Sequence, residues 1–213
     1  MDSANALVTI FGGSGFLGTQ LVQVLARRGY RIRVAVRRPD LAGHVRPLGS
    51  VGEVMPIQAN LRFPESVARA VAGADIVINL VGIGHERGAQ RFRAVHVRGA
   101  QTVAESAKAA GVRTLVQVSA LGADGQSASG YARTKALGEE AVLAAFPEAI
   151  VIRPSIMFGP GDSFFNLMGA LTRWFPVLPL IGGKSQFQPV YVGDVADAIA
   201  AAIGGAVKPG RVY

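Results

Sequence analysis

A run of glycines near the amino terminus has the spacing of a phosphate-binding turn. Gly12, Gly15 and Gly18 form the pattern G-x-x-G-x-x-G, directly after an apolar run and at the start of a helical pattern. Glycine allows backbone conformations and a close approach to the main chain that a Cβ atom would block. The free amides and positive dipole at a helix N-terminus attract a pyrophosphate. The pattern therefore predicts a dinucleotide site, and a purely structural glycine turn is the alternative.

Two arginines follow the second apolar run, where many dinucleotide-binding folds carry an acidic residue. That acid lies about 20 residues past the glycines and holds the ribose hydroxyl groups of NAD. Arg37 and Arg38 stand there instead. A guanidinium forks onto a 2′-phosphate, which a carboxylate would repel. We therefore expect NADP(H), with NAD(H) as the alternative if the arginines are ordinary surface charges. Asp40, beyond Pro39, is the residue that could reverse this preference.

A tyrosine and a lysine four residues apart could transfer a proton. Tyr131 and Lys135 would share one face of a helix. A cation beside a phenol lowers the pKa of the phenol, which eases proton transfer to a carbonyl near neutral pH. The pattern Y-x-x-x-K is common by chance, but here it begins a helical pattern one loop after Ser119. Further along the same pattern, Glu139 and Glu140 are interpreted as a solvated helix face.

Short apolar runs that alternate with helical patterns must position these residues. The runs are rich in Val, Ile and Leu, as in strands buried on both faces. This alternation implies an α/β fold with a doubly wound parallel sheet and right-handed crossovers. We expect strands at 6–11, 31–36, 54–57, 76–80, 114–119 and 149–152, and helices at 15–28, 65–72, 89–110 and 131–145.

The pattern loosens after residue 152, where proline and glycine mark a loop. A helix around 163–174 and a strand at 190–192 follow, and Asp194 is the expected N-cap of a helix over 195–203. We expect Trp174 and Phe175 to pack a small lobe, and 211–213 to begin another strand, which suggests a shortened chain. The expected parts are a dinucleotide-binding domain (1–157), a partial substrate lobe (158–190) and a return to the first domain (191–213).

Composition excludes several classes of site. The 213 residues are 50% hydrophobic, which allows a sizeable core, and they include no cysteine and three scattered histidines, so we expect no metal site. A net charge of +8 favours anionic partners such as nucleotide phosphates or an anionic membrane surface. Basic and aromatic residues do not interleave, so we expect no nucleic acid partner. Without a signal peptide or a long apolar stretch, the expected location is cytoplasmic.

Five motifs make the chain resemble the extended or atypical branch of the short-chain dehydrogenase/reductase superfamily, the NAD-dependent epimerase/dehydratase-like proteins. Within that branch, residues 153–162 and 188–196 resemble the nucleotide-binding accessory subunit of respiratory complex I and its bacterial relatives. The five motifs are the glycine turn, Asn79-Leu80-Val81-Gly82, Val118-Ser119-Ala120-Leu121-Gly122, Tyr131 to Lys135, and Arg153-Pro154-Ser155.

The resemblance implies a Rossmann fold with a small, incomplete C-terminal substrate lobe, and it assigns roles by position. Tyr131 would be the general acid/base, with Lys135 and Ser119 beside it, and all three would also contact the cofactor. The pyrophosphate would lie on Gly12, Ser14, Gly15, Phe16, Leu17 and Gly18, and the adenosine phosphate on Arg37 and Arg38. Adenine would lie by Asn60 and Leu61, its ribose by Leu80, Val81 and Gly82, the nicotinamide ribose by Lys135, and the nicotinamide by Pro154, Ser155 and Ile156.

One departure from the family pattern bears on activity. Extended enzymes carry a run of hydroxyl residues after the fifth strand, and its third member polarises the substrate carbonyl. Leu121 occupies that place here. Ser127 or Ser129 could substitute from the loop; otherwise the rate could fall by roughly 10²–10³.

Two hypotheses follow from these motifs. The first is an NADP(H)-dependent oxidoreductase or epimerase-like enzyme that acts on an unidentified small molecule through Tyr131 and Lys135. The second is a non-catalytic accessory or assembly subunit of respiratory complex I, in which the bound nucleotide is structural. The second would place the chain at the inner face of a membrane, as a peripheral partner of the respiratory complex.

Overall fold

A six-stranded parallel sheet forms the centre of the computed structural model, which describes residues 6–174 and 186–213. Its strands are β1 (Leu7–Phe11), β2 (Arg31–Val36), β3 (Val54–Gln58), β4 (Ile76–Asn79), β5 (Thr114–Val118) and β6 (Ile150–Ile152). Neighbouring strands follow the order β3-β2-β1-β4-β5-β6. The expected doubly wound sheet is confirmed. The order reverses between β1 and β4, the place where such folds bind ligands at the carboxyl ends of their strands.

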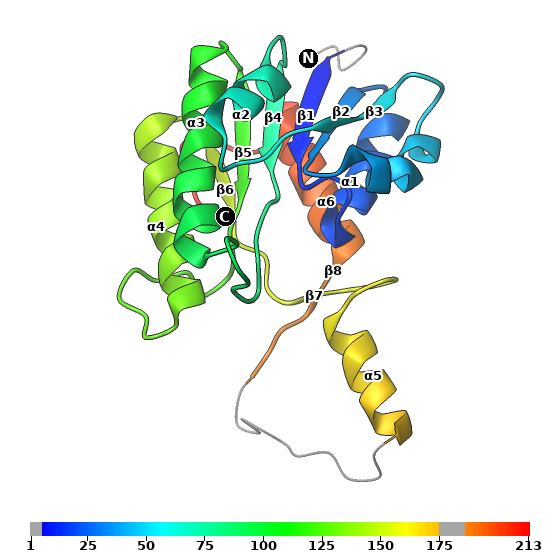
Figure 1. The fold of residues 1–213 in the computed structure, drawn as a ribbon, viewed down its shortest axis with the longest axis vertical. Coiled ribbons are helices and arrows are strands. Elements are labelled where there is room, and N and C mark those ends of the chain that lie inside the picture. Colours follow the sequence, from blue (N-terminus) through cyan, green and yellow to red (C-terminus); the bar gives the residue numbers. More distant parts are fainter. Residues whose placement is uncertain (1–5, 175–185) are drawn as a thin grey trace.

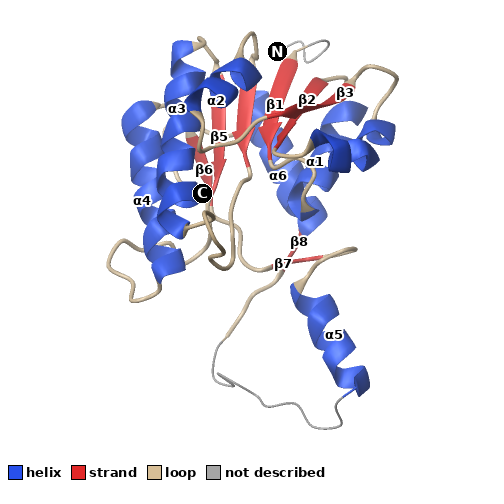
Figure 2. Ribbon diagram, viewed as in Figure 1, coloured by secondary structure: helices blue, strands red, loops and turns tan. Residues whose placement is uncertain are grey.

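Helices cover both faces of the sheet (Figures 1 and 2). Strand residues alternate between two cores because successive side chains point to opposite faces. Ile10 packs with α1 and α6, whereas Phe11 packs with α2, α3 and α4. The helices are α1 (Phe16–Arg27) and α6 (Val192–Ala201) on one face, and α2 (Pro64–Val71), α3 (Ala100–Ala109) and α4 (Gly130–Ala145) on the other.

Three helical segments have irregular geometry. The 3₁₀ helix η1 (Pro39–Leu48) follows β2, where the sequence predicted no element. The π-helix η2 (Arg93–Gly99) is the first part of the helix expected at 89–110, and α3 continues it. A second π-turn, η3 (Ala202–Ala206), ends α6. No apolar periodicity marks a π-turn, so the sequence predicts the helix but not its geometry.

The segment after β6 leaves the sheet. Strands β7 (Met157–Phe158) and β8 (Val190–Tyr191) pair in parallel, and α5 (Phe164–Trp174) extends away from them (Figure 1). Asp162 caps α5, since its Oδ1 accepts the Phe165 N–H at 2.6 Å. The packing expected of Trp174 and Phe175 concerns side chains outside the described part of the chain. The division into three parts stays a prediction.

The last residues lie beside the edge strand β6 of the sheet. Val212 pairs in parallel with Val151, and the Arg153 N–H donates to the Tyr213 carbonyl at 2.8 Å. The N-cap expected at Asp194 is wrong, because α6 begins three residues earlier and its N-cap is Tyr191. Asp194 lies exposed in the first turn, where its charge still favours the helix dipole. Within the described ranges, no helix is long and apolar enough to cross a bilayer.

Candidate functional site

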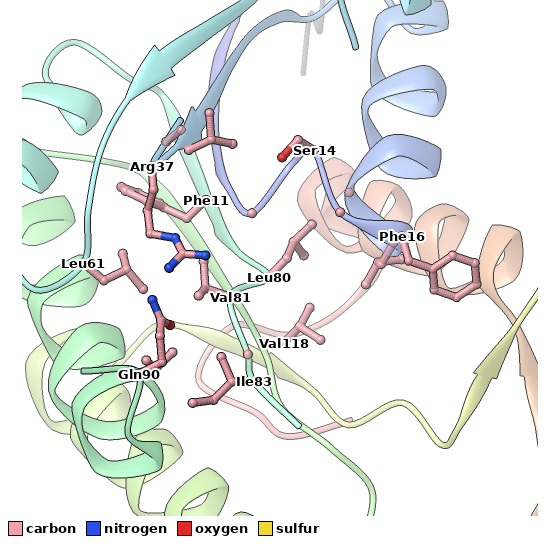
Figure 3. A pocket seen from close by; sticks show the side chains of 18 of the residues that line it. Phe11, Ser14, Phe16, Arg37, Leu61, Leu80, Val81, Ile83, Gln90 and Val118 are labelled. Carbon is pink, nitrogen blue, oxygen red and sulfur yellow. The ribbon is translucent and has the colours of Figure 1, made fainter. Parts of the chain in front are cut away.

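A cleft of about 950 Å³ crosses the carboxyl ends of the strands (Figure 3). Its size suits a nucleotide-sized ligand. Most of the predicted site residues lie on its wall, but Pro154, Ser155 and Ile156 do not, and Met157 lines it instead. The predicted residues on the wall are Gly12, Ser14, Gly15, Phe16, Leu17, Gly18, Arg37, Arg38, Asn60, Leu61, Leu80, Val81, Gly82, Ser119, Tyr131 and Lys135.

The glycine turn between β1 and α1 is shaped as an anion cradle. Gly12 has a φ of +79°, and a Cβ atom on Gly18 would lie 2.5 Å from the Gly12 carbonyl oxygen. Gly15 is the N-cap of α1 in extended conformation, and the first helical turn contains no acidic residue. The first amides of a helix lack intrahelical acceptors. The turn therefore fits a diphosphate, which would pair with these amides.

The two arginines after β2 differ in their surroundings. The Arg37 guanidinium points into the cleft toward Gln90, with Leu61 and Val81 to either side (Figure 3). No residue in the described part of the chain pairs with it. Arg38 instead donates to Asp40 at 3.0 Å, and this bond holds the pKa of the Asp40 carboxyl below its usual value. Arg37 is thus the guanidinium available to an anionic ligand.

Sequence reasoning missed several residues that line the cleft. Arg62 and Gln90 both line it. The amide N–H of Arg62 donates to the Asn60 side-chain oxygen at 3.1 Å, which fixes the loop after β3. Arg62 directly follows the predicted site residues Asn60 and Leu61, a signal that could have found it. Gln90 lies on a loop before η2, and nothing in its sequence context points to the cleft.

Tyr131 and Lys135 line the cleft from the first turns of α4. Ser129 caps this helix by accepting the Ala132 N–H at 3.4 Å. The Lys135 Nζ donates to the Val118 carbonyl at 2.9 Å, and burial lowers the pKa of Lys135 to about 8 although the Glu139 charge opposes this. Burial raises the pKa of Tyr131. The expected lowering of the phenol pKa is therefore wrong here, because desolvation dominates.

Ser119 places a buried hydroxyl on the wall of the same cleft. Its side chain is 5% exposed, and its Oγ finds no hydrogen-bond partner among the described residues. A buried hydroxyl without a partner is costly, which favours a ligand atom that completes the bond. This orphaned hydroxyl and the open glycine cradle line the same cleft, which fits a dinucleotide with a substrate oxygen beside it.

The missing hydroxyl at residue 121 has no replacement in the loop before α4. Leu121 is 66% exposed. The Ser127 Oγ accepts the Ser129 N–H, and the Ser129 Oγ caps α4. Neither serine lines the cleft, whereas Ser163 at the start of α5 does. The substitution expected from Ser127 or Ser129 is therefore not supported by the geometry.

An ion pair between a buried carboxylate and a partly exposed guanidinium supports α4. Glu139, expected on a solvated face, is 5% exposed, and that expectation is wrong. The Arg153 Nε and Nη2 donate to the two Glu139 carboxylate oxygens at 2.9 Å and 2.6 Å. The pair joins α4 to the end of β6. Because the partners lie 14 residues apart on different elements, helical periodicity could not reveal the contact.

Comparison with known proteins gives a consistent family assignment. Residues 8–213 match the family described as NAD dependent epimerase/dehydratase. The chain is 41% identical over 200 residues to the mitochondrial NADH dehydrogenase [ubiquinone] 1 alpha subcomplex subunit 9 of Arabidopsis thaliana, covering 92% of this chain and 50% of that protein. It is 38% identical over 198 residues to a ceramide reductase of Caulobacter vibrioides, covering 93% and 61%.

Solved structures give the same fold. A dTDP-glucose 4,6-dehydratase from Streptomyces venezuelae, with NAD and TYD bound, superposes with a TM-score of 0.81 at 23% identity, covering 97% of this chain and 74% of that one. At that identity the likeness concerns the fold alone. The chain spans about half the length of the first curated relatives it matches.

Proposed function

This chain belongs to the NAD dependent epimerase/dehydratase family, an NAD(P)-binding family, and from that premise we propose that it is an NADP(H)-dependent oxidoreductase. One observation carries the proposal. Tyr131, Lys135 and the orphaned Ser119 hydroxyl lie on the wall of the same cleft that contains the glycine cradle. The unpaired Arg37 favours NADP(H) over NAD(H), since its guanidinium is free to pair with a 2′-phosphate.

Three side chains have separate roles in the proposed reaction. When bound, the nicotinamide dinucleotide supplies or accepts the hydride. The Tyr131 phenol, with its raised pKa, is protonated at neutral pH and donates its proton to the carbonyl oxygen as the alcohol forms. The Ser119 hydroxyl would donate a hydrogen bond to the same oxygen. The Lys135 ammonium, held by the Val118 carbonyl, stabilises negative charge at that end of the cleft.

A lipid ketone is the first substrate class to test. The Caulobacter relative is named a ceramide reductase, which supports a keto group on a long-chain lipid. Beyond the cleft, the exposed rings of Phe158 and Phe165 border a second cavity of about 530 Å³. These rings would contact an apolar chain, and we propose that 158–190 form part of a substrate lobe.

The test is nucleotide oxidation over a panel of long-chain ketones and nucleotide sugars. We expect turnover with at least one lipid ketone, and a loss of about 10³-fold in Tyr131→Phe, in line with removal of a proton donor. Tyr213→Phe is the matched control, because Tyr213 lies at the sheet edge and its hydroxyl contacts only Lys208 among the described residues. Absence of turnover with every ketone at saturating NADPH would refute the proposal.

An accessory or assembly subunit of a membrane respiratory complex is the second candidate function. The 41% identity to a subunit of mitochondrial NADH dehydrogenase supports it, as does Leu121 in place of a polarising hydroxyl. In this case the protein binds nucleotide without turnover, as a peripheral partner at the inner face of a membrane. Tyr131→Phe would then leave assembly of the complex unchanged, and a variant that cannot bind nucleotide would impair it.

A further inference from the structure

His96 lies buried behind the cleft, on the π-helix η2. Its side chain is 3% exposed. A π-turn accommodates one extra residue and is common at functional sites. A Cβ atom on Gly138 would collide with the His96 carbonyl oxygen, so η2 and α4 are in backbone contact here. The imidazole is therefore held between the loop after β4 and the helix that carries Tyr131 and Lys135.

Two hydrogen bonds determine which nitrogen of His96 carries the proton. The Ile83 N–H, which can only donate, lies 3.1 Å from Nε2, so this nitrogen is unprotonated. Nδ1 then carries the hydrogen and donates to the Thr134 Oγ1 at 3.1 Å. Thr134 uses its own hydrogen on the Gly130 carbonyl at 2.7 Å, which leaves its lone pairs free to accept. Only a neutral imidazole gives every polar atom in this chain of hydrogen bonds a partner.

The charge state agrees with this geometry. Burial, helped by the nearby Lys135 charge, lowers the pKa of His96 to about 4. The imidazole is neutral at neutral pH as a result. An imidazolium would place a second N–H against the Ile83 N–H, and one of the two buried donors would lose its acceptor.

The ring of His96 also contacts the ring of Tyr131. The two rings meet edge to face with centroids 5.4 Å apart, while Phe92 stacks on His96 at 5.3 Å and meets the Tyr131 ring edge to face at 6.0 Å. Such edge contacts prefer one orientation of the rings. Tyr131 thus packs against a side chain that is itself fixed by two hydrogen bonds.

We propose that His96 is a positioning residue whose neutral imidazole ties the cleft-lining Ile83 loop to α4 and fixes the ring of Tyr131 at the cleft. This role rests on the function proposed above. The bonds to Ile83 and Thr134 hold the loop and the helix at a set separation, and the ring contact sets the direction of the phenol. A misplacement of about 1 Å at a reacting group can cost 10²-fold in rate.

The first test needs no turnover. In the full chain, ¹⁵N NMR of the imidazole is expected to show the Nδ1–H tautomer at pH 7, and amide exchange at Ile83 is expected to accelerate at least tenfold in His96→Leu. The matched control is His85→Leu, since His85 is exposed on the loop after β4 and does not line the cleft. An Nε2–H tautomer, an imidazolium, or unchanged Ile83 exchange would overturn the proposal.

The second test separates positioning from general destabilisation. At saturating NADPH, His96→Gln is expected to lower kcat 10- to 100-fold while the Kd for NADPH rises less than fivefold. In a Tyr131→Phe background the same substitution should change kcat less than twofold, because its effect acts through Tyr131. Equal losses in both backgrounds would assign His96 a merely structural role. If the wild type has no turnover, the proposed function fails, and the NMR and exchange results alone decide the role of His96.

Discussion

Arg37 and Arg38 are adjacent residues of one type with different electrostatic surroundings. Arg38 is paired with Asp40, whereas Arg37 points unpaired into the cleft within the part of the chain the structure describes (Figure 3). The sequence placed both at the 2′-phosphate and named Asp40 as the residue that could reverse NADP preference. The geometry instead assigns Asp40 to Arg38, which leaves the charge of Arg37 uncompensated. The two arginines should therefore contribute unequally to nucleotide choice.

Replacing each arginine separately tests this inequality. We expect Arg37→Ala to weaken NADPH binding at least tenfold and NADH binding less than twofold, because only the former carries the 2′-phosphate. Arg38→Ala should weaken NADPH binding less than threefold. Isothermal calorimetry measures both. Unchanged NADPH affinity in the double variant would show that the 2′-phosphate does not bind these two residues.

The low pKa of Lys135 predicts a pH limit on activity. In the unliganded protein this group loses its proton above about pH 8 because burial disfavours the charge, while the pKa of Tyr131 lies above its ordinary value of 10.0. The value of kcat/KM reports the free enzyme, so it should fall about tenfold per pH unit above pH 8. Lys135→Arg should abolish this alkaline fall in kcat/KM, since a guanidinium stays charged. If kcat/KM of Lys135→Arg still falls above about pH 8, another group is responsible for the fall.

Spacing along the chain was enough to find some residues of the site. Gly12, Gly15 and Gly18, and the pair Tyr131 and Lys135, are local patterns, and the structure gathers all five on the cleft. The direction of the Tyr131 pKa shift was not predictable, since it depends on burial by distant elements. The same limit applies to every property that comes from tertiary packing.

An ion pair with a buried carboxylate links α4 to the end of β6. Glu139→Gln leaves the Arg153 guanidinium without its carboxylate, which should lower the free energy of unfolding by about 2–3 kcal/mol. It also removes the negative charge that raises the pKa of Lys135, so the alkaline fall in kcat/KM should begin below pH 8. Urea unfolding and the pH profile measure the two effects.

Glu140→Gln is the control for this ion pair. Glu140 is the next residue on α4 and is exposed, so its substitution should change stability by less than about 0.5 kcal/mol. Equal effects of the two substitutions would show that the buried pair makes no special contribution.

The junction of β1 and α1 requires glycine at residue 18 for packing as well as for binding. A Cβ atom there would lie 2.5 Å from both the Gly12 carbonyl oxygen and the Gly13 Cα. Gly18→Ala must therefore move α1 away from the turn, which should cost about 2 kcal/mol and weaken NADPH binding at least tenfold. Gly43→Ala is the control, since a Cβ atom there has nothing within 4 Å. Wild-type affinity in Gly18→Ala would show that the cradle tolerates displacement.

Most elements could be predicted because their periodicity is local. Strand β2 was expected at 31–36 and observed there, α1 differs from expectation by one residue at each end, and α4 by one residue at its start. The exceptions depend on geometry without an apolar pattern: η1 has no regular stripe, and the π-turn η2 needs tertiary contacts such as that between Gly138 and His96. The error at Asp194 has a similar cause: Val192 is buried in the core, and the helix already begins at this residue, before Asp194.

The arrangement of the whole sheet followed from the alternation of strands and helices. That alternation fixes parallel strands and crossover hand, and the observed order reverses beside the glycine turn. The segment beyond β6 was harder to predict, because β7 and β8 are only two residues long and their pairing joins residues 157–158 to 190–191. Short strands carry too few side chains for a periodic signal.

A nucleotide that binds only the folded chain should stabilise the whole molecule. The cradle, Arg37 and the Tyr131 end come from separate elements of the sheet and its helices, so a ligand across the cleft bridges elements that separate on unfolding. At 100 times its Kd, NADPH should add about 2.7 kcal/mol, a rise in Tm of about 5–10 °C for a chain of this size. NADH at the same concentration should add less, and Arg37→Ala should abolish the difference. Tyr131→Phe should keep most of the stabilisation, because the glycine cradle and Arg37 supply most of the nucleotide affinity. If neither nucleotide raises the Tm of the folded protein, the cleft is not a dinucleotide site and the proposed chemistry at Tyr131 loses its basis.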